Sequence, residues 1–139
     1  MLKILDTIKN LTDNRLDEVE EWFANARSIS EPYFYTSVDL RHSGLRLAPV
    51  DTNLFPAGFN NLSPAAQERA SLYITRYLQD HYPKAKKALI LPENHTRNLA
   101  YFDNLAVLMS LLEKSGLETR IGSINPELGS PQKFTAASG

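Results

Sequence analysis

The sequence has no cysteine among its 139 residues and almost no imbalance of charge, with a formal net charge of −1 at pH 7. Without cysteine it can form neither a disulfide nor a thiolate zinc site, which fits a reducing compartment. A near-neutral chain lacks the broad basic surface that general binding to nucleic acids or anionic membranes requires. We therefore expect neither a nucleic-acid partner nor a membrane partner.

Long apolar runs are also missing. No segment approaches the roughly 18 consecutive apolar residues that a membrane-spanning helix needs. The first residues, MLKILDTIKNL, lack the apolar core and the small-residue cleavage site of a secretory signal. Hydrophobic residues make up 42% of the chain and charged residues 22%, a composition typical of a folded domain. We expect a globular cytoplasmic protein.

Several well-known motifs of catalysis and phosphate binding are absent. The chain contains no G-x-x-x-x-G-K-[ST] loop, no G-x-G-x-x-G turn and no H-E-x-x-H helix. Its three histidines, His42, His81 and His95, lack the spacing of metal ligands. The sequence thus predicts no metal site, and the phosphate site of any bound nucleotide is not visible in it.

The first 31 residues are expected to form a helical segment. Residues 2–10 suit a short helix, and residues 11–27 suit a second one, with apolar side chains at spacings of three and four. Thr12 or Asp13 can cap the second helix. Pro32 ends the segment, because the residue before a proline avoids the helical backbone conformation.

An α/β domain is expected over residues 32–124. The aromatic and β-branched residues at 33–38 favour a strand, and residues 45–47 allow a second short strand. Ser63-Pro64 is a typical helix start, since serine caps the helix and proline suits its first position.

The most regular pattern lies at residues 88–124. ALIL at 88–91 favours a buried strand, an apolar stripe favours a helix over 97–115, and residues 118–124 favour another strand. This order predicts a βαβ unit with a right-handed parallel crossover. The predicted fold class is therefore α/β, with N-terminal helices before a small, mostly parallel sheet. Residues 125–139 look irregular.

One candidate site follows the strand at 88–91, because ligands of open α/β sheets bind beyond the carboxyl ends of the strands. Free N–H groups at the start of the next helix favour an anion, and Arg97 adds a permanent charge. Further polar contacts there can come from Glu93, His95, Thr96 and Asn98. The alternative is that Thr96 or Asn94 only caps the helix and the other side chains are solvated.

A second candidate site lies in SVDLRHSGLRLAPVDTNLFPAGFNNL, residues 37–62. Its charged and amide side chains can satisfy both ends of a zwitterion, which needs donors and acceptors together. They are Asp39, Arg41, Arg46, Asp51, Asn53, Asn60 and Asn61. The alternative is an ordered loop whose asparagines bond their own backbone and whose Phe55 and Phe59 pack in the core.

Both segments resemble one family, the proteobacterial type of glutamate–cysteine ligase, also called γ-glutamylcysteine synthetase. The resemblance is carried by VDLRHSGLRLAPVDTNLFPAGFNNL, LPENHTRNLAYFDNLAVL and ETRIGSINPEL, and it runs through most of the 139 residues. It implies ATP-dependent joining of the glutamate γ-carboxylate to the amino group of cysteine through an acyl phosphate, with magnesium accompanying ATP. This reaction is the first step towards glutathione.

The resemblance also implies where the parts of such an enzyme lie. Ligases of this family are much longer chains, and their architecture looks like that of ATP-grasp enzymes, in which a leading α/β domain precedes the domains that hold ATP. We therefore expect the ATP and magnesium sites outside this chain and a missing remainder after residue 139. The isolated chain can be inactive even if its parent is an enzyme.

Within this chain we expect only recognition of the amino-acid substrates. Candidates for binding carboxylate or phosphate are Arg41, Arg46 and Arg97. Candidates for binding the substrate ammonium, or less readily magnesium, are Asp39, Asp51 and Glu93. Candidates for orienting hydrogen bonds are Asn53, Asn60, Asn61, Thr96 and Asn98.

Two other functions are compatible with the sequence. The chain can be a non-catalytic α/β domain that binds a small molecule, or a subunit-interface domain. The second alternative fits the incomplete sheet, because a parallel sheet normally has more strands and is covered on both faces. Association into a homo-oligomer is left open.

Overall fold

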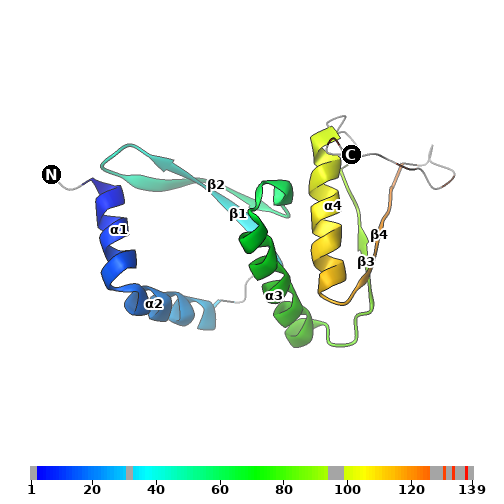
Figure 1. Ribbon diagram of the computed structural model, residues 1–139, viewed down its shortest axis with the longest axis horizontal. Helices are drawn as coiled ribbons and strands as arrows, with labels where there is room; N and C mark the ends of the chain where they lie inside the picture. The colour runs from blue at the N-terminus through cyan, green and yellow to red at the C-terminus, as the bar shows by residue number, and fades with distance from the viewer. Residues whose placement is uncertain are drawn as a thin grey trace. The chain divides into compact units, whose positions relative to one another are not determined.

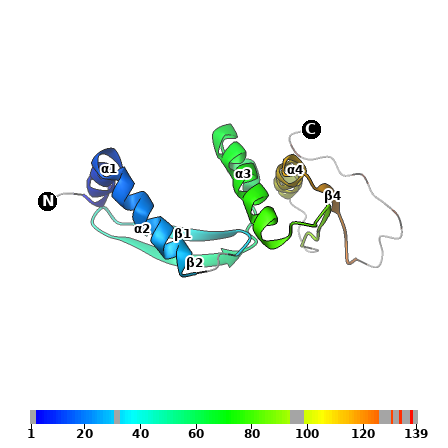
Figure 2. The same ribbon diagram turned by 90° about the horizontal axis from the view of Figure 1, so that it is seen from below.

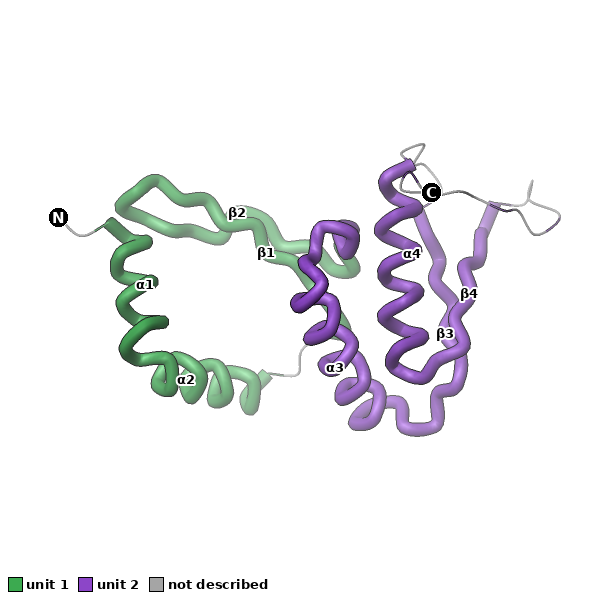
Figure 3. The backbone as a smooth tube through the Cα atoms, in the orientation of Figure 1, with its two compact units in different colours: residues 1–56 green, residues 57–139 purple. Residues whose placement is uncertain are grey.

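The computed structural model describes residues 3–30, 33–93 and 99–125, together with residues 130, 133 and 137. The chain divides into two compact units, unit 1 with residues 1–56 and unit 2 with residues 57–139 (Figure 3). None of the described helices is long and apolar enough to cross a membrane.

Unit 1 begins with two helices, α1 (Ile4–Asn14) and α2 (Leu16–Ser28), which meet at a bend (Figure 1). The sequence places the cap of the second helix at Thr12 or Asp13, and this prediction is wrong. Arg15 stands at the N-cap instead, with φ −139° and ψ 34° and no capping bond from its side chain. Local charge pairs accompany this difference in position.

These charge pairs lie on either side of the bend. Asp13 stays inside α1, where its carboxylate binds the ammonium of Lys9 one turn earlier at 2.6 Å. The guanidinium of Arg15 binds the carboxylate of Glu18, and this hydrogen bond lowers the pKa of Glu18 and raises that of Arg15. All four side chains are solvent-exposed, so the two pairs contribute little to the stability of the fold.

The rest of unit 1 contains an antiparallel hairpin of β1 (Thr36–His42) and β2 (Leu47–Leu54). In the turn, the Ser43 N–H donates to the Arg46 carbonyl at 3.0 Å, and Gly44 adopts a φ of 89°. The sequence predicts a second strand at 45–47 only and a mostly parallel sheet. Both predictions are wrong for this unit, because β2 is longer and its pairing is antiparallel.

Two features of β2 interrupt the alternation of apolar and polar side chains by which a strand is recognised in a sequence. Pro49 brings no N–H donor to the ladder, which is tolerated only at edges and irregularities. The register passes from Asp39–Asp51 to Leu40–Pro49, so Val50 is the extra residue of a β-bulge. A bulge shifts the period of two by one residue, and the strand therefore looks like a loop in the sequence.

Unit 2 contains the predicted βαβ unit. Its elements are η1 (Phe59–Asn61), α3 (Pro64–His81), β3 (Lys87–Ile90), α4 (Leu99–Lys114) and β4 (Glu118–Ile121). β3 and β4 pair in parallel, which confirms the predicted crossover through the long helix. α4 lies between α3 and the strand pair in both views (Figure 1 and Figure 2).

Helix ends in unit 2 follow the sequence signals. The Ser63 hydroxyl accepts a bond from the Ala66 N–H at 3.3 Å, and Pro64 occupies the first turn, as predicted. At the end of α4, Gly116 adopts a φ of 92°, which glycine reaches without strain. The Leu117 N–H then donates back to the Leu112 carbonyl at 3.2 Å, which completes a Schellman cap.

The buried residues of the described chain lie in unit 2. The apolar ones are Leu105, Leu108, Leu111 and Leu112 of α4, Ile74 of α3, and Leu117. Leu111 is the most deeply buried, at 1% exposure. The broad stripe of α4 is thus covered from more than one side, as its sequence predicts. No described residue of unit 1 is buried.

Candidate functional site

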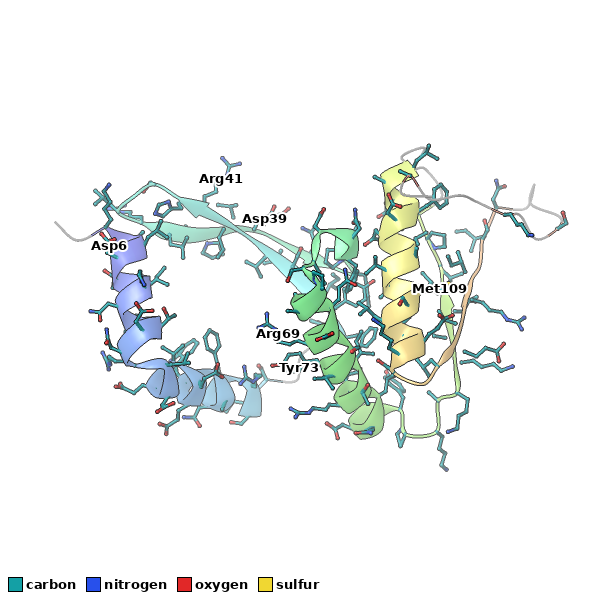
Figure 4. The ribbon with its side chains drawn as sticks, in the orientation of Figure 1. Asp6, Asp39, Arg41, Arg69, Tyr73 and Met109 are labelled. Atoms are coloured by element: carbon teal, nitrogen blue, oxygen red, sulfur yellow. The ribbon has the colours of Figure 1, made fainter. Side chains whose placement is uncertain are left out.

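One face of the hairpin gathers four of the predicted site residues. Asp39 lies directly opposite Asp51 in the ladder, and Ser37 lies opposite Asn53. Side chains of directly paired residues share a face, and so do alternate residues of one strand, so Arg41 joins this set. Figure 4 shows Asp39 and Arg41 projecting from the same side of the hairpin. We call Asp39, Arg41, Asp51 and Asn53 the polar face.

Opposed carboxylates give this polar face its electrostatic character. Asp39 and Asp51 are cross-strand partners, and like charges in this position destabilise a hairpin. The Asn53 amide donates to Asp51 Oδ2 at 3.3 Å, which satisfies only part of the carboxylate. The arrangement favours a cation, such as an ammonium, between the two carboxylates. The guanidinium of Arg41 offers paired N–H donors for a carboxylate nearby.

Metal binding is less well supported at this place. In the described ranges, no group of three or more histidine, cysteine, aspartate or glutamate side chains comes together. Two carboxylates can contribute to a magnesium site only when water or substrate phosphates supply the remaining ligands. The polar face therefore suits an ammonium on its own and a magnesium ion only alongside a bound phosphate.

The opposite face of the hairpin carries exposed apolar side chains. Val38, Leu40 and Leu54 are 51%, 57% and 55% exposed. Arg46 stands in the turn, where its carbonyl closes the loop, so it does not belong to the ladder that holds the polar face. The hairpin thus separates predicted binding residues on one face from apolar residues on the other.

The two predicted asparagines of unit 2, Asn60 and Asn61, lie in η1 and are exposed. Gly58 precedes them with a φ of 119°, a conformation that strains other residues. The Asn61 N–H donates to the Gly58 carbonyl at 2.9 Å. We call residues 58–61 the asparagine turn.

A buried residue that the sequence reasoning missed holds this turn. Asn104 of α4 is 5% exposed, and its Oδ1 accepts bonds from the N–H groups of Gly58 at 2.7 Å and Phe59 at 2.9 Å. The available signal was a polar, poor helix-forming residue beside Leu105, within the apolar stripe of the helix. Its partners, more than forty positions earlier, are not visible in the sequence pattern.

The sequence also allowed that Phe55 and Phe59 pack in the core, and the structure shows this only in part. Phe59 is half-buried, but Phe55 is 60% exposed and packs edge-on against Tyr35, with ring centroids 5.2 Å apart. Phe55 also has a φ of 54°, which is unfavourable for a residue with a side chain.

The other predicted segment is described only at its first residues. Glu93 is exposed, and its backbone N–H donates to the Tyr101 hydroxyl at 3.2 Å. His95, Thr96, Arg97 and Asn98 lie outside the described residues. The anion site expected at the start of α4 therefore stays a prediction.

The chain is similar to proteins of one family over nearly its whole length. A family model described as glutamate–cysteine ligase (GshA) matches residues 9–139. A solved structure, that of a candidate γ-glutamylcysteine synthetase from Methylobacillus flagellatus KT, is 42% identical with a TM-score of 0.85. The similarity covers 99% of this chain and 32% of that one. No curated protein matches. The chain belongs to the glutamate–cysteine ligase family.

Proposed function

We propose that this chain is the amino-acid-recognising part of an ATP-dependent ligase that joins the γ-carboxylate of L-glutamate to the amino group of L-cysteine. The family match over residues 9–139 supports the ligase reaction. The observation that carries the recognition role is the polar face of the hairpin, where opposed carboxylates stand beside an arginine. Because the chain spans 32% of the solved relative, catalysis is assigned to a longer chain.

The chemistry explains why recognition and catalysis can be separated. A carboxylate is a poor acylating agent, so ATP first phosphorylates it, and the cysteine amine then attacks the acyl phosphate and expels phosphate. Such reactions depend mainly on positioning the reactants and on stabilising charge that develops on the phosphoryl oxygens. A magnesium ion bound with ATP would supply that charge stabilisation. The residues of this chain would hold and orient the amino acid.

Each group of the polar face has a proposed role. Asp39 and Asp51 bind the α-ammonium of the substrate, since each faces the other carboxylate across the ladder and like charges in that position repel each other. Arg41 binds a substrate carboxylate, and Asn53 orients Asp51. In the same proposal, further contacts to the amino acid come from Arg46, Asn60, Asn61, Glu93, His95, Thr96, Arg97 and Asn98.

The nucleotide is proposed to bind outside this chain. The sequence has neither a G-x-x-x-x-G-K-[ST] loop nor a G-x-G-x-x-G turn, which fits an ATP-grasp-like arrangement in which later domains hold ATP and magnesium. A cytoplasmic location is part of the same proposal, because a chain without cysteine forms no disulfide and needs no oxidising compartment.

The test is a coupled assay on the ligase chain that carries these 139 residues. We expect phosphate release and γ-glutamylcysteine formation only when glutamate, cysteine, ATP and magnesium are all present. Omitting each amino acid in turn is the control. Phosphate release that is unchanged without glutamate or without cysteine would contradict the proposal.

A second candidate function is supported by the exposed apolar side chains of unit 1. Among them are Trp22 at 66%, Ile29 at 87% and Tyr33 at 68% exposure, and exposed apolar surface is what a protein–protein contact covers. A subunit-interface domain, including one that forms homo-oligomers, would use such a surface. Association that depends on concentration, with no ligand-induced rise in melting temperature, would favour this function over amino-acid binding.

A further inference from the structure

Asn104 is the only buried residue of α4 whose side chain is polar, within the part of that helix which the structure describes. A single oxygen, Oδ1, accepts both backbone N–H groups at the entry to the asparagine turn, at 2.7 Å from Gly58 N and 2.9 Å from Phe59 N. Two short bonds to one atom fix the direction of two consecutive peptide planes. A leucine at this position would fit the helix but would leave both donors without an acceptor.

The far end of the turn is held as well. The Leu62 carbonyl accepts a bond from the Gln67 side chain at 3.0 Å, and the Ser63 hydroxyl caps α3. The backbone from Gly58 to Ser63 is thus anchored to α4 at one end and to α3 at the other. Between these anchors stand two exposed amide side chains, those of Asn60 and Asn61.

A buried anchor beneath exposed amides is the arrangement expected of a binding turn. Exposed asparagines are common in connecting turns, so the feature that distinguishes this turn is the buried amide of Asn104, which holds two of its backbone N–H groups. A turn that binds a ligand gains from a fixed backbone, because less conformational freedom is lost when the ligand binds.

We propose that Asn104 is a positioning residue for the amino-acid substrate, acting through the asparagine turn. It does not touch the substrate. It holds Gly58 and Phe59 so that the amides of Asn60 and Asn61 are aligned before the substrate arrives. The inference rests on the proposed function, in which these two asparagines contact the amino acid.

The experiment compares Asn104→Leu with Asn104→Asp in the ligase chain that carries these residues. Leucine removes the acceptor, so we expect the KM for the amino acid bound by the turn to rise about tenfold, while the KM for ATP stays unchanged. Aspartate keeps an acceptor oxygen at the same place, so it should restore most of the affinity.

A matched control separates positioning from a general loss of stability. Leu112→Ala removes buried side-chain volume two turns further along α4 and lowers the melting temperature without touching the turn. We expect Leu112→Ala to leave the KM for both amino acids unchanged. A rise in KM equal to that of Asn104→Leu would show that Asn104 is merely structural, and would overturn the inference.

A double-mutant cycle tests the route of the effect. In a background with Asn60→Ala and Asn61→Ala, the Asn104→Leu change should have no further effect on KM, because the aligned amides are gone. An effect that persists in full would overturn the inference. If the unaltered ligase makes no γ-glutamylcysteine, the proposed function itself fails, whereas an active ligase with a normal KM in Asn104→Leu refutes only the role of Asn104.

Discussion

The two compact units position their candidate binding residues in different ways. In unit 2 the asparagine turn is anchored by Asn104, which sits beside the buried leucines of α4. In unit 1 the polar face is arranged by the hydrogen-bond ladder of the hairpin and by the bond from the Asn53 amide to Asp51, and no described residue there is buried. Alignment in unit 2 is therefore coupled to a hydrophobic core, whereas alignment in unit 1 depends on strand pairing.

The energetic consequence follows from simple magnitudes. Ordering one residue costs roughly 1–2 kcal/mol of backbone entropy, and burial of apolar surface returns roughly 25 cal/mol per Å². Unit 1 keeps large apolar side chains such as Trp22 and Ile29 mostly exposed, so it recovers little of that cost by itself. The predictions below test this contrast between the units.

The largest difference should appear when the units are prepared as separate peptides. Residues 57–125 keep every buried leucine, and we expect a cooperative thermal transition in circular dichroism. For residues 1–56 we expect no cooperative transition, because an isolated hairpin is marginal in water. A sharp transition in the shorter peptide would show that unit 1 is stable without any covering surface.

Core truncation should distinguish the units next. Leu111 is 1% exposed, so Leu111→Ala should lower the free energy of unfolding of the 139-residue chain by about 2–5 kcal/mol. Val38 is 51% exposed, and Val38→Ala should cost less than about 1 kcal/mol. Urea unfolding of both variants provides the measurement. Equal losses would mean that Val38 is covered in solution.

A substitution on the polar face should separate stability from function. Asp51→Asn removes the like charge opposite Asp39, so it should raise the free energy of unfolding of the hairpin by about 0.2–1 kcal/mol. In the ligase chain it should lower kcat/KM for glutamate at least about tenfold, or about 1.4 kcal/mol. Thr52→Val, on the opposite face, is the control and should leave the kinetics unchanged. Normal kinetics in Asp51→Asn would remove Asp51 from the site.

The smallest effect is expected at the bend between α1 and α2. Because Arg15 lowers the pKa of Glu18, their pair adds stability above the ordinary pKa of glutamate and loses it as pH falls through the lowered value. The pair is exposed, so Glu18→Gln should speed amide exchange in the first turn of α2 only slightly at neutral pH. At a pH below the lowered pKa, wild type and variant should exchange equally. A difference that persists there would have another cause.

Local signals in the sequence predicted much of unit 2. Ser63-Pro64 and Gly116 are recognisable because capping depends on residues within one turn of the helix end. The stripe of α4 is recognisable because burial on two sides leaves few polar positions. These features needed no knowledge of distant contacts.

Features that depend on long-range pairing were not predictable in the same way. The full length of β2 was missed because Pro49 and the bulge at Val50 interrupt its alternation of apolar and polar side chains. Asn104 was missed because its role depends on partners 45 and 46 residues away. The shared face of Asp39 and Asp51 likewise follows from the register, which composition alone does not fix.

The short parallel pair in unit 2 has a consequence for handling the protein. In the described structure β3 and β4 pair only with each other, so each presents an outer edge that can template pairing between molecules. Leu89 on β3 is 63% exposed, which adds an apolar surface to that edge. Lys86 and Lys87 flank it, and Lys87 pairs with Glu118 at 3.3 Å. Charged side chains next to an exposed strand edge oppose pairing between molecules, so we expect that removing Lys86 and Lys87 makes concentrated solutions of the protein more prone to aggregate.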